Sequence, residues 1–244
     1  MANARSPYIA RLDMDDLMMP ERLQREFDYL EAHPDVAMVC TYAQLIFERT
    51  LSNKFYRAPL NSKALALRLV FECPIVHPCV MFRATVLREL GGYSEDNLFS
   101  GAEDFELWTR MAHQHKLKCL PEPLTRYRVR SNSVSHSRKT LDHNVVISAN
   151  TLHWYLRENF STTECRALAA IYHRNAESIS PLPLKEALTM FNVVAGMIAV
   201  PRSTWDKETA QVFAMQRRLI FFHHLSRNAL LRPLAQMIPG LRLR

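Results

Sequence analysis

The sequence lacks the patterns that mark secreted, membrane-spanning and zinc-binding proteins. Its five cysteines are scattered and no two of them form a CxxC pair, which argues against a disulfide framework and a zinc site. No apolar run reaches the ~18 to 20 residues that span a bilayer. The first residues show no apolar core of a signal peptide. We therefore expect a cytoplasmic protein with reduced thiols.

Patterns typical of nucleic-acid binding are also missing, although the net charge is +7. Residues 1–125 hold 14 Lys and Arg against 17 Asp and Glu, whereas residues 126–244 hold 17 against 7. A basic half can serve nucleic acid, anionic lipid or solubility. Because zinc-finger and Gly/aromatic patterns are absent from it, we expect no nucleic-acid partner.

The most informative stretch is an apolar run, residues 8–12, that is followed by the carboxylates Asp13, Asp15 and Asp16. The run predicts a buried strand that opens into a loop at the aspartates. Because side chains alternate along an extended chain, Asp13 and Asp15 are expected on one side. Two neighbouring carboxylates suit Mg²⁺ or Mn²⁺. The alternative is that Asp16 or a neighbour caps the helix that begins near Pro20.

The first 138 residues alternate between strand-like and helix-like patterns, which predicts an α/β domain. A helix over 20–32 is predicted from Pro20 and from an apolar stripe of Leu23, Phe27 and Leu30. Residues 41–60 show no clear pattern beyond a short strand at 44–47. The other predicted elements are strands 36–40, 77–83, 118–120 and 124–129, a helix from Ser62 to before Pro74, a helix over 85–90, and a helix that opens at 101–104.

From about residue 139 the pattern becomes purely helical, so we divide the chain into an α/β domain, residues 1–138, and a helical C-terminal region, residues 139–244. Helices are predicted over 142–158, 162–177, 184–199 and 207–230. The segment 217–244 combines bulky apolar residues with arginine. It is compatible with ordinary helix packing or with peripheral contact of the C-terminal helices with the cytoplasmic face of a membrane.

Several segments of the first domain occur together in one enzyme family. They are the aspartate loop with the helix after it, the strand 77–83, the turn Gly91-Gly92-Tyr93, the helix with Glu103-Asp104 and Leu107-Trp108, and the pair Tyr127-Arg128. In this order and spacing they resemble the inverting family 2 glycosyltransferases of the GT-A fold, over roughly residues 3–135. The resemblance implies a partial, Rossmann-like GT-A domain.

The resemblance also implies roles for the acidic residues. Asp13 and Asp15 match the family's DxD, which contacts the donor ribose and a divalent cation (Mg²⁺ or Mn²⁺) at the donor diphosphate, where the cation neutralises developing charge. Asp104 matches the general base that takes the proton from the acceptor hydroxyl, and Glu103 is its usual neighbour. Without the DxD match, Glu103 and Asp104 would be read as acidic residues that the dipole of a helix favours.

Three basic residues are further candidates for the site. His77 is a candidate for contact with the metal or the diphosphate, with a structural histidine as the alternative. Arg126 and Arg128 are candidates for holding the donor phosphates, with a solvated strand edge as the alternative. We expect Trp108 to lie in the core.

The family places a nucleotide-binding part before its DxD, and here twelve residues precede Asp13. We therefore expect this chain to lack the N-terminal nucleotide-binding part, and donor binding to require a longer protein or a partner chain that supplies it.

The implied function is transfer of a sugar from a nucleotide-sugar donor to a hydroxyl acceptor in polysaccharide, glycolipid or glycoprotein biosynthesis. Two other functions are compatible with the same residues. One is a catalytically inactive glycosyltransferase-like fragment that acts as an interaction or membrane-associated protein and shows no metal-dependent nucleotide binding. The other is a metal-dependent phosphohydrolase, which would release phosphate from simple esters without an acceptor.

Overall fold

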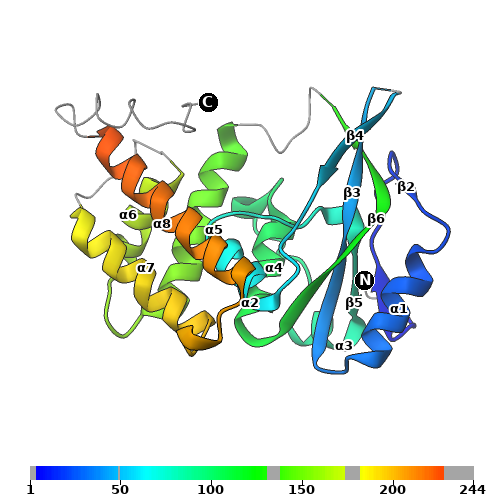
Figure 1. The fold of residues 1–244 in the computed structure, drawn as a ribbon, viewed down its shortest axis with the longest axis horizontal. Helices are drawn as coiled ribbons and strands as arrows, with labels where there is room; N and C mark the ends of the chain where they lie inside the picture. The colour runs from blue at the N-terminus through cyan, green and yellow to red at the C-terminus, as the bar shows by residue number, and fades with distance from the viewer. Residues whose placement is uncertain (1–3, 49, 131–137, 174–181, 228–244) are drawn as a thin grey trace.

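The computed structural model describes residues 4–48, 50–130, 138–173 and 182–227. A mixed sheet forms one side of the molecule and a group of helices forms the other (Figure 1). Helix α1 (Arg22–Ala32) packs against one face of the sheet, while α2 (Ser62–Leu69) and α4 (Glu103–Gln114) lie between the sheet and the C-terminal helices. The structure confirms the predicted α/β domain followed by a helical region.

The sheet has the strand order β1-β5-β3-β6-β2, and β4 pairs with the C-terminal end of β3. Among the described strands, β3 and β6 pair in parallel and all other neighbours are antiparallel. The bounds are Tyr8–Ala10 for β1, Leu17–Met18 for β2, Val36–Phe47 for β3, Thr50–Tyr56 for β4, Val80–Arg83 for β5 and Lys116–Val129 for β6.

The aspartate loop, residues 11–16, connects the two ends of this strand order, from β1 to β2. Four strand spacings of a flat sheet would separate these ends by about 19 Å. The loop contains a turn, in which the Asp16 amide donates to the Asp13 carbonyl at 3.2 Å, so it could cover that span only if the rest of it were almost fully extended in one direction. The sheet therefore curls, which brings the aspartate loop against β6, where the Arg128 amide donates to Asp16 Oδ1.

In two parts of the sheet the strands differ from those predicted from the sequence. Residues 41–60, which showed no clear pattern, form a hairpin in which β3 continues to Phe47 and β4 returns. The two strands expected at 118–120 and 124–129 are the single strand β6, which passes through Pro121 and Pro123 where its register with β3 shifts. Such irregularities accommodate proline and break the alternation of side chains that marks a strand.

The start of the strand expected at 77–83 is a 3-10 turn, His77–Cys79, and only β5 is extended. The expected helix at 85–90 is α3 (Ala84–Glu89), and a second 3-10 turn, Asn97–Phe99, precedes α4.

The predicted apolar stripe of α1 is wrong for two of its three residues. Leu23 and Phe27 are exposed, and only Leu30 is buried. The buried face of α1 instead carries Arg22 and Glu26, which form an ion pair of 3.0 Å at zero exposure.

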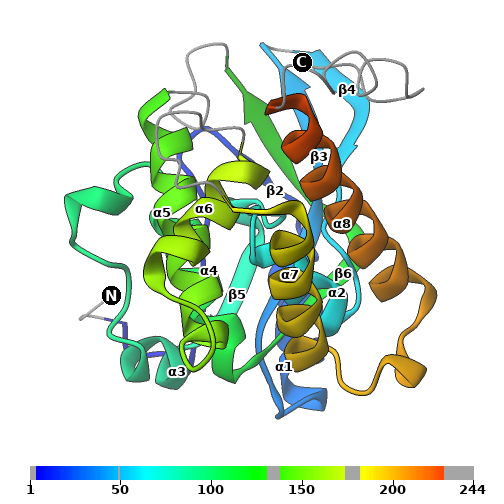
Figure 2. The same cartoon turned by 90° about the vertical axis from the view of Figure 1, so that its left-hand side faces the viewer.

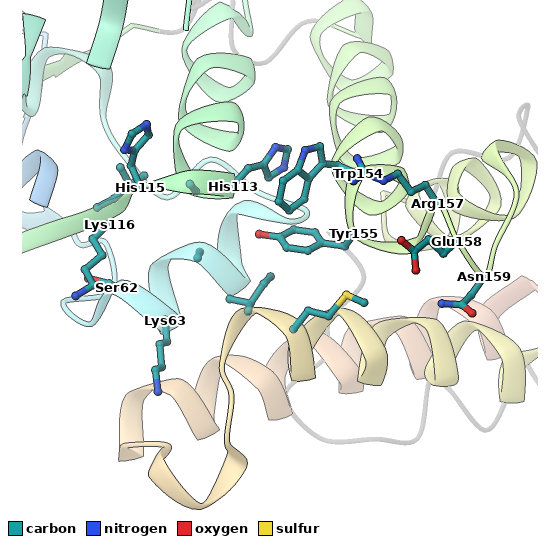
Figure 3. Close-up of a pocket in the computed structure, with 15 residues that line it drawn as sticks. Ser62, Lys63, His113, His115, Lys116, Trp154, Tyr155, Arg157, Glu158 and Asn159 are labelled. Atoms are coloured by element: carbon teal, nitrogen blue, oxygen red, sulfur yellow. The ribbon is translucent and has the colours of Figure 1, made fainter. Parts of the chain in front are cut away.

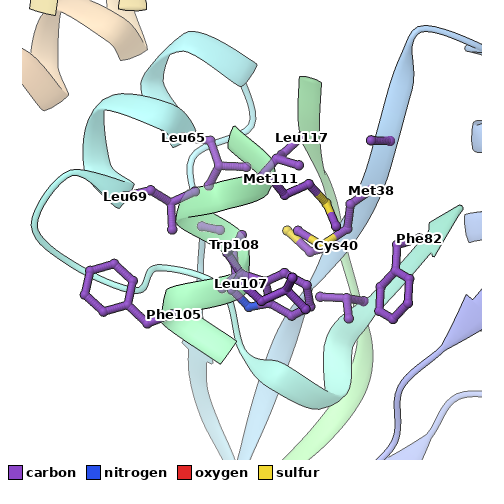
Figure 4. Close-up of a cluster of buried hydrophobic side chains, with 14 of the residues drawn as sticks. Met38, Cys40, Leu65, Leu69, Phe82, Phe105, Leu107, Trp108, Met111 and Leu117 are labelled. Atoms are coloured by element: carbon purple, nitrogen blue, oxygen red, sulfur yellow. The ribbon is translucent and has the colours of Figure 1, made fainter. Parts of the chain in front are cut away.

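The α/β core lies between the sheet and helices α2 and α4 (Figure 4). Trp108 is fully buried at its centre, as expected, with its ring centroid 6.0 Å from that of Phe82 on β5. Met38 and Cys40 of β3 and Leu65 of α2 belong to the same cluster. This packing fixes α4 against the sheet and thereby sets the position of its first turn.

The C-terminal region is helical, with α5 over Arg138–Leu156, α6 over Thr162–Tyr172, α7 over Leu184–Ile198 and α8 over Lys207–Arg227. Figure 2 shows α7 and α8 beside α2, and α5 beside α4. The helix expected over 162–177 ends at Tyr172, and residues 174–181 and 228–244 lie outside the described residues. Phe71, just after α2, stacks on Tyr172 with ring centroids 4.2 Å apart, which joins the two regions.

The segment expected to contact a membrane falls partly on α8. Phe222 is buried there and Phe221 is 38% exposed. No helix among the described residues combines the length and apolar content that a bilayer crossing requires.

Candidate active site

The aspartate loop is held by its own backbone and by β6. The Arg128 amide donates to Asp16 Oδ1 at 2.7 Å, and Asp16 is only 6% exposed. Burial raises the pKa of Asp16 to about 6, although the Arg128 amide opposes the shift. Asp16 is therefore the aspartate that fastens the loop to the sheet, and it does not cap α1.

Asp13 and Asp15 are more accessible than Asp16 and each forms an ion pair. Arg11 Nη2 lies 2.7 Å from Asp13 Oδ1, and Arg130 Nη2 lies 2.9 Å from Asp15 Oδ2. Because such pairs are only weakly stabilising near the surface, an anionic ligand or a cation can replace them at little cost.

Glu103 and Asp104 are the first two residues of α4, and Ala102 separates them from Gly101. Gly101 has a φ of 83°, which suits glycine, and its amide donates to Glu103 Oε2 at 2.7 Å. Glu103 therefore closes the turn before the helix. The Phe105 amide donates to Asp104 Oδ1 at 2.7 Å.

Burial raises the pKa of Asp104, and His77 is the group that opposes this shift most. A carboxylate with a raised pKa is a stronger proton acceptor. Burial lowers the pKa of His77, whereas the charges of Asp104, Asp13 and Glu103 raise it. His77 thus lies where the aspartate loop and the start of α4 meet.

Two tyrosines that the sequence did not single out as site residues also lie at this junction. Tyr93 is hydrogen-bonded to Nε2 of His77 at 2.7 Å. Burial raises the pKa of Tyr127, and the charges of Asp16, Asp13 and Asp104 raise it further. Both tyrosines belong to the motifs Gly91-Gly92-Tyr93 and Tyr127-Arg128, which were the signal available in the sequence.

The structure therefore brings together four of the predicted site residues, Asp13, Glu103, Asp104 and His77, although Asp13 and Asp104 lie far apart in the chain. Arg126 and Arg128 are placed differently. Because side chains alternate along a strand, both leave β6 on the face opposite Tyr127. Arg128 Nε donates to the Asp15 carbonyl at 3.0 Å, so its side chain ties the aspartate loop to β6.

Arg22, on the buried face of α1, holds the start of the aspartate loop in place. Its Nη2 donates to the carbonyls of Arg11 and Val80 at 3.0 and 3.2 Å, and Glu26 balances its charge. The Arg11 amide also donates to the Val80 carbonyl at 3.0 Å. The start of the loop and the start of β5, which follows His77 closely, are thus fixed to one buried guanidinium.

The donor set of the loop fits a divalent cation that shares its coordination with a ligand. Among the described residues, no three His, Cys, Asp or Glu side chains converge as a preformed metal centre. Mg²⁺ is usually held by one or two carboxylates together with substrate phosphates and water. Asp13 and Asp15 supply that number of hard oxygen ligands.

Comparison with known proteins agrees with these motifs. Residues 1–91 match the family model described as glycosyl transferase family 2. The chain is 31% identical over 131 residues to the amylovoran biosynthesis glycosyltransferase AmsE of Erwinia amylovora, with 53% of this chain and 48% of that protein covered. Over this N-terminal part the chain is similar to glycosyl transferase family 2.

Two further relatives show similar coverage. The O-antigen biosynthesis glycosyltransferase WbnJ of Escherichia coli is 31% identical over 132 residues, with 53% of this chain and 50% of that protein covered. An uncharacterized glycosyltransferase of Methanocaldococcus jannaschii is 29% identical over 140 residues, with 56% of this chain and 47% of that protein covered. The chain spans about half the length of these relatives.

Proposed function

We propose that this chain forms the acceptor-side part of a glycosyltransferase active site. Asp104 takes the proton from an acceptor hydroxyl, whose oxygen attacks the sugar on the face opposite the departing nucleotide diphosphate, so that the configuration inverts. The supporting observation is the meeting of Asp104 with the aspartate loop around His77 and Tyr127. A carboxylate that served only as a helix cap would not need that placement.

In this proposal Asp13 and Asp15 hold Mg²⁺ or Mn²⁺, which neutralises charge on the diphosphate when bound. Arg128 orders the loop through the Asp15 carbonyl. Arg126 remains a candidate for contact with the donor phosphates, because its Nε is buried and has no hydrogen-bond partner among the described residues. A nucleotide-binding part, from a longer protein or a partner chain, completes the donor site.

The names of two relatives refer to amylovoran and O-antigen biosynthesis. By this similarity we propose that the acceptor belongs to a cell-envelope polysaccharide.

Peripheral contact of α8 with an anionic membrane also remains a proposal. It predicts salt-sensitive co-sedimentation with anionic liposomes that Phe221→Ser reduces, whereas recovery that neither salt nor the substitution changes would count against it.

The decisive experiment compares Asp104→Asn with Asp15→Ala in the protein purified with any partner that it retains. Asp104→Asn keeps the shape of the side chain but cannot accept the proton, so turnover should fall by ~10² to 10⁴ while donor affinity stays the same. Asp15→Ala should instead weaken binding of the metal and nucleoside diphosphate. Asp28→Asn, an exposed change on α1, is the control and should alter neither quantity.

Wild-type turnover in Asp104→Asn would overturn the base assignment. Phosphate release from simple esters, without transfer to any hydroxyl acceptor, would favour the phosphohydrolase. Absence of metal-dependent nucleotide binding in the purified protein would favour the inactive interaction protein.

A further inference from the structure

A cavity of about 560 Å³ lies at the opposite end of α4 from Asp104 (Figure 3). It is bordered by α2, by the junction of α4 with β6, by the end of α5 and by α7. A second cavity of about 490 Å³ adjoins it and shares His113 and Trp154. His113 is nine residues from Asp104 along α4, about 14 Å at the helical rise. The first cavity is therefore separate from the candidate active site.

Aromatic rings form one wall of the cavity. The His113 ring stacks on Trp154 with centroids 4.3 Å apart and planes 7° apart, and Tyr155 meets Trp154 edge-on at 4.8 Å. In Figure 3 the ring of Tyr155 extends into the space between these rings and α7. Trp154 is 36% exposed, whereas Trp108 in the core is fully buried. An exposed indole held in a rigid aromatic group offers apolar area to a ligand.

His113 contributes an uncharged ring to the same wall. Burial lowers the pKa of His113 to about 4, with a smaller contribution from Arg110, so the ring is neutral at physiological pH. Its Nε2 is buried and has no hydrogen-bond partner among the described residues. Because this nitrogen has almost no exposed surface, His113 contributes its uncharged ring to the wall and offers no hydrogen bond to a ligand.

The rim of the cavity is mainly cationic. Lys63, Lys116 and Arg157 line it, against the single carboxylate of Glu158. The Arg157 guanidinium lies 6.0 Å from the centroid of Trp154. Lys116 is paired with Asp35 at 2.7 Å, but that pair is exposed and so contributes little. A negatively charged group at the rim would thus find cations beside an aromatic wall.

From these features we propose that the cavity binds an acidic saccharide, as a second attachment point for the acceptor chain. The C–H face of a sugar ring would pack on the aromatic wall, and a carboxylate would meet Arg157 beside Trp154. The choice of a saccharide rests on the proposed function, whereas the requirement for an anionic ligand with an apolar face rests on the cavity itself.

The test is titration of the full chain with hexagalacturonate and with neutral maltohexaose, followed by tryptophan fluorescence and calorimetry. We expect hexagalacturonate to bind saturably and change the fluorescence, and maltohexaose to bind about 10-fold more weakly or not at all. Trp154→Ala and Arg157→Gln should each weaken hexagalacturonate binding about 10-fold. Trp154→Phe keeps an aromatic face and should retain most of the affinity.

Lys185→Gln is the matched control, because Lys185 is exposed on α7 outside the cavity and the change removes the same charge. If it weakens binding as much as Arg157→Gln, the interaction is general charge attraction and the proposal is wrong. Equal affinity for the two oligosaccharides, or saturable displacement by adenosine monophosphate, would also overturn it. Binding of the oligosaccharide does not depend on turnover. If hexagalacturonate binds but no sugar transfer is detected, the proposed function is rejected and the proposed binding site is not.

Discussion

The Tyr93 hydroxyl lies 2.7 Å from Nε2 of His77 and joins the turn after α3 to the turn before β5. Burial lowers the pKa of His77 and raises the pKa of Tyr93. At neutral pH both side chains are therefore uncharged, and the direction of the bond depends on the tautomer of His77. The bond restrains the imidazole of His77 beside Asp104.

Removal of this bond is the first prediction. Tyr93→Phe should lower the free energy of unfolding by about 1 to 3 kcal/mol, because a buried ring nitrogen loses its partner. It should also change the populations of the two neutral tautomers of His77, which nitrogen-15 NMR of that residue would detect. Tyr29→Phe, on the far side of the sheet, is the control and should leave the His77 signals unchanged. Unaltered His77 signals in Tyr93→Phe would show that the bond does not set the tautomer.

The second prediction concerns the anchor of the aspartate loop. Arg22→Met should destabilise the protein by about 3 to 5 kcal/mol, because Glu26 would remain buried without its partner. The double variant Arg22→Met/Glu26→Leu should recover much of that stability. It should still bind a metal–nucleoside diphosphate more weakly than wild type, since the Arg11 carbonyl is no longer held. Wild-type ligand affinity in the stable double variant would reject a positioning role for Arg22.

The third prediction is a pH dependence of stability. Burial raises the pKa of Glu26 to about 7 from 4.5, although Arg22 opposes the shift. The folded state therefore binds this proton more tightly than the unfolded state, and stability falls as pH rises from about 4.5 to about 7. The group contributes on the order of 3 kcal/mol to that fall.

Urea unfolding between pH 4.5 and 8 measures this contribution. Glu26→Gln cannot ionise, so its curve should lack the corresponding fall. Glu21→Gln, an exposed change just before α1, should follow the wild-type curve. Parallel curves for wild type and Glu26→Gln would mean that the carboxyl is already ionised at low pH.

The fourth prediction separates the two arginines of β6. Arg128→Ala removes the bond to the Asp15 carbonyl, so it should lower the stability of the ligand-free protein by about 1 to 3 kcal/mol. If Arg126 contacts donor phosphate, Arg126→Ala should leave that stability nearly unchanged and weaken diphosphate binding in a salt-dependent manner. Calorimetric melting and nucleotide titration distinguish the two. Equal effects of both changes on ligand-free stability would contradict the division of roles.

The acidic residues of the candidate site could be singled out from the sequence because they leave local patterns. Carboxylates that follow a strand, such as Asp13, or that open a helix, such as Asp104, are visible in a short window of sequence. The roles of Tyr93 and Tyr127 arise only when the sheet curls and distant segments meet. No short-range pattern encodes that meeting.

Periodicity failed on α1 for a different physical reason. It assigns apolar residues to the core, yet Arg22 is buried because two carbonyls and a carboxylate satisfy its guanidinium. Leu23 and Phe27 are displaced to the surface as a result. On β6 the prolines suggested a break, whereas the strand absorbs them through shifts of register.

Helix α2 and the turn after it take part in three hydrophobic clusters. Leu65 and Leu69 belong to the cluster beneath the sheet, Phe71 to that of the C-terminal helices, and Leu67 to a third cluster with residues of α7 and α8. Unfolding of α2 would therefore remove packing contacts from all three hydrophobic clusters at once. The α/β domain and the helical region should therefore not unfold independently of each other. We expect heat or denaturant to disrupt both in one cooperative transition.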